Sequence, residues 1–174
     1  MNYAAIKRYD IANGPGVRVS LFVSGCTHHC KDCFNAEAWD FCYGEPFTQA
    51  TADSILQALQ PDYIRGLTLL GGEPFEPQNQ PAVLGLVRQV RSAYPQKTIW
   101  AYSGYLLEDM LAKKLGPWEI TSELLSLLDV LVDGEFVAEK KNLSLRFRGS
   151  SNQRIIDLPA TLSSGCVQLW DETQ

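Results

Sequence analysis

The chain has 174 residues, of which 45% are hydrophobic, 20% charged and 10% aromatic. This length is enough to bury a sizeable core, and we expect one domain over residues 1–174. The 15 basic and 20 acidic residues give a net charge of -5 without a dense Lys and Arg stripe, which excludes the usual footprint of non-specific nucleic-acid binding, so no nucleic acid is expected as a partner.

Residues 1–10 have neither the apolar core nor the small-residue cleavage site of a leader peptide. No apolar run in the sequence approaches the roughly 20 residues that a membrane-spanning helix needs. We therefore expect a soluble, cytoplasmic protein with no membrane partner.

Short β-rich runs then alternate with amphipathic stretches along the chain. We predict strands over residues 17–23, 67–70, 98–102 and 129–132, a further extended piece near 154–157, and helices over 52–59, 81–93 and 122–128. The second of these helices has its valines and leucine at 83, 86, 87 and 90 on one face. This alternation is typical of βα units around a largely parallel sheet, so the predicted fold class is α/β.

Each unusual motif follows the end of a predicted strand. The motifs are three cysteines after 17–23, Gly71-Gly72-Glu73-Pro74 after 67–70, Ser103-Gly104-Tyr105 after 98–102, and Asp133-Gly134 after 129–132. The carboxyl ends of parallel strands lie on one side of a sheet or barrel. We therefore expect these four loops to converge on one site.

Cys26, Cys30 and Cys33 form a CxxxCxxC spacing within a chain of five cysteines, an odd number that suits pairwise disulfides poorly. One loop can wrap three thiolates around a single soft metal centre, and iron-sulfur clusters take thiolate ligands. In a 4Fe-4S cubane, three local cysteines leave one iron without a protein ligand. That open iron could bind a small molecule.

Zinc is the alternative interpretation of these cysteines. A tetrahedral site could take His28, His29, Cys42 or Cys166 as a fourth ligand, which would make the chain a zinc-stabilised binding module without catalysis. Cys42 and Cys166 have no partner at ligand spacing, and we expect each to be a small buried apolar side chain. His28 and His29 are expected on the loop surface or in local hydrogen bonds.

Gly71 and Gly72 allow the backbone to turn sharply and to approach a ligand, because neither carries a Cβ that would intrude on the ligand or strain the backbone. Glu73 beside them can accept a charge-assisted hydrogen bond from an ammonium group. Ser103 and Asp133 are strand-end polar groups that could reach a ribose or an ammonium group, or else cap a loop or helix.

The cysteine motif followed by the aromatic Phe34, together with Gly71-Gly72-Glu73-Pro74, resembles the radical S-adenosylmethionine superfamily. Residues 13–18 (NGPGVR) and 21–26 (LFVSGC) narrow this resemblance to glycyl-radical-enzyme activases. Residues 129–136 and 148–153 are similar to the corresponding segments of the proteins that activate anaerobic ribonucleoside-triphosphate reductase. The resemblance covers the chain from about Tyr3 to Leu158.

The resemblance implies one 4Fe-4S cluster, because the chain lacks the cysteine-rich insert of some related activases. Its ligands would be Cys26, Cys30 and Cys33. The adenine of S-adenosylmethionine would lie near Asp32, Cys33 and Phe34, and its methionine group near Gly71, Gly72 and Glu73. No catalytic residue is implied beyond the ligands of the cluster and the cofactor.

The chain is shorter than the roughly 250 residues of a typical full (βα) barrel, so we expect an incomplete barrel of the radical S-adenosylmethionine type, open on one side. The resemblance implies that a one-electron donor such as flavodoxin reduces the cluster. S-adenosylmethionine is then cleaved, and a glycyl radical forms on an anaerobic ribonucleoside-triphosphate reductase. A radical enzyme acting on a small molecule or peptide, such as a queuosine-pathway synthase, is the remaining alternative.

Overall fold

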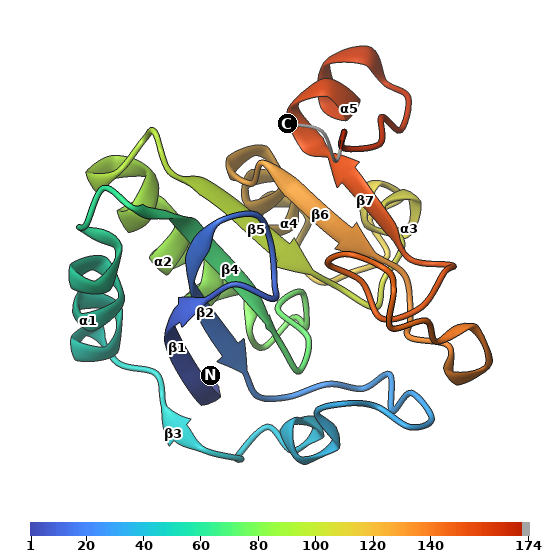
Figure 1. The fold of residues 1–174 in the computed structure, drawn as a ribbon, viewed down its shortest axis with the longest axis horizontal. Coiled ribbons are helices and arrows are strands. Elements are labelled where there is room, and N and C mark those ends of the chain that lie inside the picture. The colour runs from blue at the N-terminus through green and yellow to red at the C-terminus, as the bar shows by residue number, and fades with distance from the viewer. Residues whose placement is uncertain (172–174) are drawn as a thin grey trace.

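The computed structural model describes residues 1–171 and contains a seven-stranded open sheet flanked by helices (Figure 1). The order of the strands is β3-β1-β2-β4-β5-β6-β7. Their bounds are β1 Asn2–Asp10, β2 Val17–Val23, β3 Glu45–Pro46, β4 Ile64–Gly71, β5 Thr98–Tyr102, β6 Val130–Asp133 and β7 Arg154–Asp157. The predicted α/β class is confirmed.

The centre of the sheet is parallel, as the sequence predicts. Strands β2, β4, β5 and β6 pair in parallel, whereas β1 and β3 at one edge and β7 at the other are antiparallel. All five predicted extended segments are strands, with β4 beginning earlier than expected at Ile64. The sequence interpretation missed β1 and β3.

Residues 1–171 contain five α-helices, four of them between strands and the last one after β7, and two short 3-10 helices cover Ala36–Trp39 and Ala138–Lys140. The α-helices are α1 Gln49–Leu59, α2 Gln80–Ala93, α3 Leu107–Leu111, α4 Trp118–Leu127 and α5 Leu158–Ser164. The three predicted helices correspond to α1, α2 and α4. Helix α1 begins earlier than expected because Thr48 and Thr51 form a capping box at its first turn.

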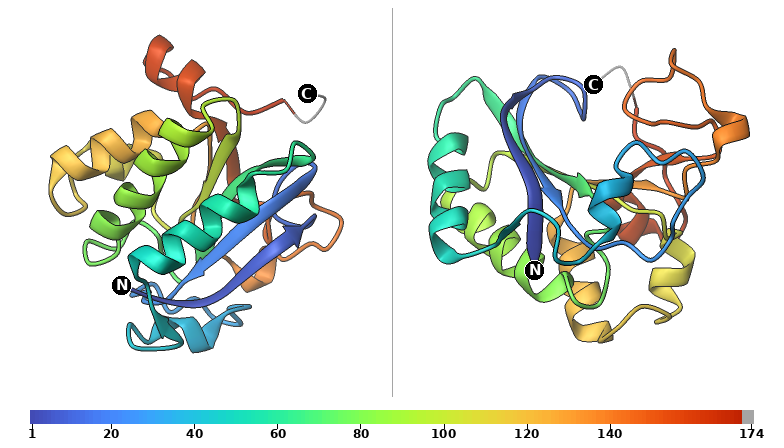
Figure 2. Two further views of the ribbon diagram at one scale, coloured as in Figure 1. Left: turned by 90° about the vertical axis from the view of Figure 1, so that its left-hand side faces the viewer. Right: turned by 90° about the horizontal axis from the view of Figure 1, so that it is seen from below.

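Helices α1, α2 and α4 cover one face of the sheet (Figure 2). The predicted apolar face of α2 is buried there, with Val83, Leu86, Val87 and Val90 each at most 1% exposed. On the other face, Trp100 packs with Phe147 and Trp170. The segments that follow β2 and β6 lie close together at the carboxyl end of the sheet (Figures 1 and 2). Within residues 1–171, no helix is long and apolar enough to cross a membrane.

Candidate functional site

The four strand-end loops surround one cavity of about 430 Å³. The loop after β2 contributes Cys26, Cys30 and Cys33, and the loop after β4 contributes Gly71, Gly72 and Glu73. The loop after β5 contributes Ser103 and Gly104, and the loop after β6 contributes Gly134. The predicted convergence of the loops is therefore confirmed. Phe34, whose side chain is exposed, also lines the cavity.

Two of the candidate residues do not line this cavity. Asp32 is exposed on the cysteine loop, in a left-handed backbone conformation with φ of 56°. Asp133 is fully buried, and it accepts hydrogen bonds from the Leu107 backbone N–H and from Arg154 Nε, each at 2.9 Å. Asp133 thus holds the start of α3, which is the capping role that the sequence left open. The cofactor roles of Asp32 and Asp133 stay predictions.

The three cysteines of the motif are free thiols, with Cys26 buried and the other two partly exposed. Burial raises the pKa of the Cys26 thiol to about 12 and raises that of Cys30 as well. Both thiols are therefore protonated at neutral pH in the metal-free chain, and metal ligation must release their protons.

The donor set fits an iron-sulfur cluster. No group of three Cys, His, Asp or Glu side chains in residues 1–171 is arranged to hold a single metal ion. A cubane does not require such convergence, since each of the three thiolates would bind a different iron. Three thiols on one loop, all lining one cavity, meet that requirement.

The expectation that Cys42 and Cys166 are buried is wrong. Both are exposed. Cys42 lies in an exposed turn in which its backbone N–H donates to Asp40 Oδ1 at 2.9 Å, and Cys166 follows the end of α5, where Gly165 has a φ of 71°. Neither position faces the core, so the apolar character of the thiol does not decide its location.

The cysteine loop is held in place by the loop after β4. Thr27 donates from its backbone N–H and its hydroxyl to Glu76 Oε1, at 2.8 and 2.6 Å. The Glu73 backbone N–H donates to the Gly25 carbonyl at 2.8 Å. Glu76 is nearly fully buried, and the sequence interpretation missed it. In the sequence, Glu76 is marked only by its position, because it is an acidic residue that follows the Gly71-Gly72-Glu73-Pro74 motif and Phe75.

His28 links its own loop to the other three, contrary to the expectation of a surface position or local bonds. Its side chain is 9% exposed, with Nδ1 2.9 Å from Glu135 Oε1 and Nε2 3.2 Å from Glu73 Oε2. Its ring also packs on Tyr105, with 4.3 Å between centroids. Burial acts to lower the pKa of His28, but the contacts with the two glutamates outweigh burial and raise that pKa to about 9. His29 is exposed, as expected, and stacks on Trp39.

Glu73 joins the loops after β4 and β5. Its carboxylate is 1% exposed and accepts hydrogen bonds from the Phe75 and Gly104 backbone N–H groups, at 2.8 and 2.7 Å. The Ser103 hydroxyl donates to the same carboxylate at 3.1 Å. These donors orient Glu73 at the cavity wall, and Ser103 reaches the site through this contact.

Close backbone approach explains the two glycines before Glu73. Gly71 has a φ of 107°, and a Cβ there would lie 2.7 Å from the Val23 carbonyl oxygen. A Cβ on Gly72 would lie 2.6 Å from the Gly25 carbonyl oxygen. The expected backbone strain on adding a side chain thus applies at Gly71, where φ is positive. At Gly72 a side chain would instead collide with the cysteine loop.

Comparisons with known proteins agree with this site. A family model described as a 4Fe-4S single cluster domain matches residues 12–156. The anaerobic ribonucleoside-triphosphate reductase-activating protein of Escherichia coli K12 is 44% identical over 155 residues, which cover 88% of this chain and 96% of that protein. The proteins of the same name from Vibrio cholerae and Enterobacteria phage T4 are 43% and 42% identical over 157 residues, covering 89% of this chain and 97% and 93% of theirs. The family match favours an iron-sulfur cluster over zinc.

Proposed function

Since the chain belongs to the family of anaerobic ribonucleoside-triphosphate reductase-activating proteins, we propose that it activates such a reductase by means of a 4Fe-4S cluster and S-adenosylmethionine. The observation that carries this proposal is the single cavity shared by the three motif cysteines and by Gly71, Gly72 and Glu73. Residues 1–174 would form one radical S-adenosylmethionine domain in the cytoplasm. Its open sheet would be an incomplete (βα) barrel.

Cys26, Cys30 and Cys33 would hold the cluster as thiolates. The first part of the loop, around Cys26, is fixed to its neighbours through Glu76 and the Gly25 carbonyl, so this part would be oriented before a cluster binds. Three thiolate ligands would leave one iron of a 4Fe-4S cluster open to S-adenosylmethionine.

The cofactor would lie between the cysteine loop and the loop after β4. Its methionine group would pass the backbone of Gly71 and Gly72, where the buried Glu73 carboxylate attracts an ammonium group. The adenine would lie near Asp32, Cys33 and Phe34, on the side where the Phe34 ring packs against Phe136 with 5.0 Å between centroids.

A cluster held by Cys26, Cys30 and Cys33 and reduced by a one-electron donor such as flavodoxin would supply the electron for reductive cleavage of S-adenosylmethionine, and with it the radical chemistry that activates a glycine of the reductase. The protein would orient the cofactor and shield it from water. The glycine segment of the partner would enter on the side of Phe34, which is exposed at the cavity wall.

The test is electron paramagnetic resonance on the reductase from the same organism, mixed with the reduced protein and S-adenosylmethionine. We expect a doublet glycyl signal together with 5'-deoxyadenosine and methionine. Cys30→Ala should give none of the three products, whereas Cys166→Ala, at an exposed cysteine outside the cavity, should give all of them.

Two results would separate the alternatives. Cleavage of S-adenosylmethionine without a radical on the matched, active reductase would refute the activase role and leave a radical enzyme for a smaller substrate. A colourless protein with stoichiometric zinc after anaerobic purification would refute the cluster and favour a binding module.

A further inference from the structure

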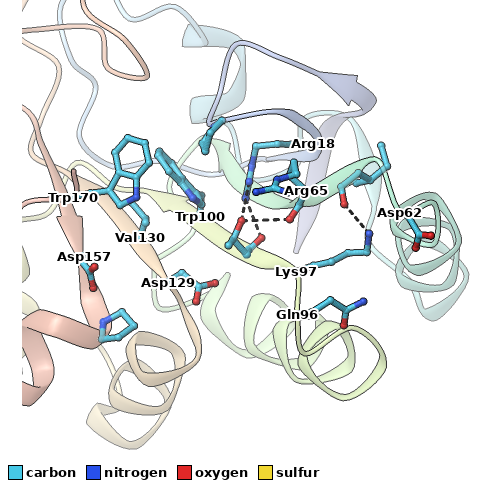
Figure 3. Close-up of a pocket in the computed structure, with 14 residues that line it drawn as sticks. Arg18, Asp62, Arg65, Gln96, Lys97, Trp100, Asp129, Val130, Asp157 and Trp170 are labelled. Atoms are coloured by element: carbon cyan, nitrogen blue, oxygen red, sulfur yellow. Dashed lines mark hydrogen bonds between the residues drawn. The ribbon is translucent and has the colours of Figure 1, made fainter. Parts of the chain in front are cut away.

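A second cavity, of about 470 Å³, lies at the end of the sheet where the parallel strands begin, away from the cysteines. Figure 3 shows the residues that line it. It is lined by the first residues of three parallel strands, among them Ile64 of β4, Thr98 of β5 and Val130 of β6.

Ile64 in this cavity and Gly71 in the cysteine cavity stand at the two ends of β4, on the order of 20 Å apart. The walls of the two cavities meet at Phe147, which lines the cysteine cavity and packs on Trp100 and Trp170 of the second one. Among residues 1–171, the lining residues of one cavity do not recur in the other, so the two are distinct sites.

The floor of this cavity contains a buried cation with only neutral partners. Arg18 is fully buried, and its guanidinium donates to the hydroxyls of Thr68 and Thr98 at 2.7 and 2.9 Å. It also donates to the carbonyls of Leu67 and Thr98 at 2.8 and 3.0 Å. No carboxylate in residues 1–171 forms a hydrogen bond or ion pair with it. Buried charges are normally paired, so this arrangement lacks a counter-ion.

Two further cations line the same end of the cavity (Figure 3). Lys97 is 5% exposed, and its Nζ donates to the carbonyls of Pro61 and Ile64 at 2.9 and 2.7 Å. Arg65 is exposed, and within the described part of the chain its guanidinium has no hydrogen-bond or ion-pair partner. Burial lowers the pKa of Arg18 to about 10, and the charge of Arg65 adds to that lowering, whereas Tyr102, Asp129 and Asp10 act in the opposite direction. Within residues 1–171, none of these three cations has a directly bonded carboxylate.

Three carboxylates also line this cavity, but none of them forms a hydrogen bond or an ion pair with Arg18, Arg65 or Lys97. Asp129 accepts hydrogen bonds from Arg91 Nη2 and from the Ile99 backbone N–H, both at 2.6 Å. Asp157 caps α5 by accepting from the Ala160 backbone N–H at 2.9 Å. Asp62 stands exposed on the rim near Lys97. The first two carboxylates already have partners of their own.

We propose that the end of this cavity formed by Arg18, Arg65 and Lys97 binds a phosphate group, either as the free anion or as a monoester. Three cations suit a dianion better than a carboxylate, and a guanidinium matches phosphate oxygens in a bidentate arrangement. The hydrogen bonds described above leave one N–H group of Arg18 and one of Lys97 free to donate to a ligand. Within residues 1–171, all the guanidinium N–H groups of Arg65 are free to do so.

The adjoining wall can accommodate the organic part of an ester. Pro15, Pro159 and the half-buried Trp170 line this wall, and Trp170 is held edge to face against Trp100 with 5.0 Å between centroids. A flat ring attached to the phosphate would pack against these apolar surfaces. The free anion and the ester share the phosphate group. The two ligands of the test distinguish between them.

The test is anaerobic isothermal titration calorimetry of the full-length, cluster-loaded protein with inorganic phosphate and, separately, with adenosine monophosphate, at constant ionic strength. Arg65→Gln should weaken binding by about tenfold or more, because it removes charged donors that line the cavity. Since Arg65 is exposed, we expect this variant to fold. Arg88→Gln is the matched control, since Arg88 is an exposed arginine on α2 outside the cavity. It should leave the affinity unchanged.

Tighter binding of the monoester than of phosphate would identify an ester as the ligand, and equal affinities would identify the free anion. Failure of both to bind at concentrations up to about 10 mM would overturn the proposal. So would an affinity that Arg65→Gln does not change, or an equal loss in Arg88→Gln, which would indicate attraction by overall charge.

Discussion

Replacing Arg154 by alanine would test how the loop after β6 is held beside the cysteine cavity. Arg154 Nε donates to Asp133 Oδ1 at 2.9 Å, its Nη2 contacts Asp133 Oδ2, and its Nη1 donates to Glu108 at 2.8 Å. Asp133 is fully buried, so in Arg154→Ala its carboxylate would keep only the Leu107 N–H as a donor. A buried carboxylate that loses its cation typically costs about 3–5 kcal/mol.

The lower end of that range applies here, because the Arg154 side chain is 30% exposed and water can enter the space that it leaves. We expect a loss of about 3 kcal/mol in the free energy of unfolding. With a slope of about 2 kcal/mol per molar urea, the midpoint of unfolding should fall by about 1.5 M. The measurement is anaerobic urea denaturation of the cluster-loaded protein, followed by circular dichroism, with midpoints compared directly.

Arg88→Ala provides the matched control. Arg88 forms a two-bond pair with Glu123 on the protein surface, where both side chains are at least 40% exposed, so its loss should cost below about 1 kcal/mol. Adding Asp133→Asn to Arg154→Ala should recover part of the stability, because a neutral amide leaves no buried charge. Equal midpoints for Arg154→Ala and Arg88→Ala would refute the reasoning.

Two further predictions concern acid stability and the glycine pair. The hydrogen bond from Arg154 lowers the pKa of Glu108 to about 2, so its contribution to stability is present above the ordinary value of 4.5 and is lost as the pH falls towards 2. Glu108→Gln should therefore lose less stability than the wild type over that interval in an acid titration followed by circular dichroism. Identical loss of stability with falling pH in the two proteins would contradict this. A Cβ on Gly72 would lie 2.6 Å from the Gly25 carbonyl oxygen, so Gly72→Ala should lower the iron and sulfide content after reconstitution. Gly85→Ala, in open space on α2, should keep the full content and gain about 0.5–1 kcal/mol, and equal loading of the two variants would show that the cysteine loop tolerates the contact.

The central strands could be predicted because parallel strands are buried on both faces and therefore appear as nearly continuous apolar runs. Strand β2, with the sequence VRVSLFV, and strand β4, with the sequence IRGLTLLG, show this pattern. Strand β1 was missed because it lies near the sheet edge, where Lys7 and Arg8 are exposed. Its position is determined by antiparallel pairing with β2, a long-range contact that leaves little local signal.

The convergence of the loops was predictable from the parallel strand order alone, but the side-chain contacts within them were not. Periodicity determines which way a side chain points on a helix or strand, and it gives no such guidance in a loop. His28 and Glu76 therefore left no clear signal, although each is bonded across loops. The average behaviour of cysteine predicts a buried position for Cys42, whereas the turn that begins at Asp40 leaves it exposed.

The cysteine loop itself shows why such contacts decide the geometry of the site. His29 and Asp32 adopt left-handed backbone conformations, with φ of 51° and 56°, which cost energy for residues other than glycine. Such conformations persist only where the surroundings hold them. Here other segments contact the loop: Gly25 and Cys26 donate their N–H groups to the carbonyls of residues 38 and 39, Thr27 is bound by Glu76, and the ring of His29 stacks on that of Trp39. The motif thus brings three thiols to the cavity, and residues outside the motif hold the loop that carries them.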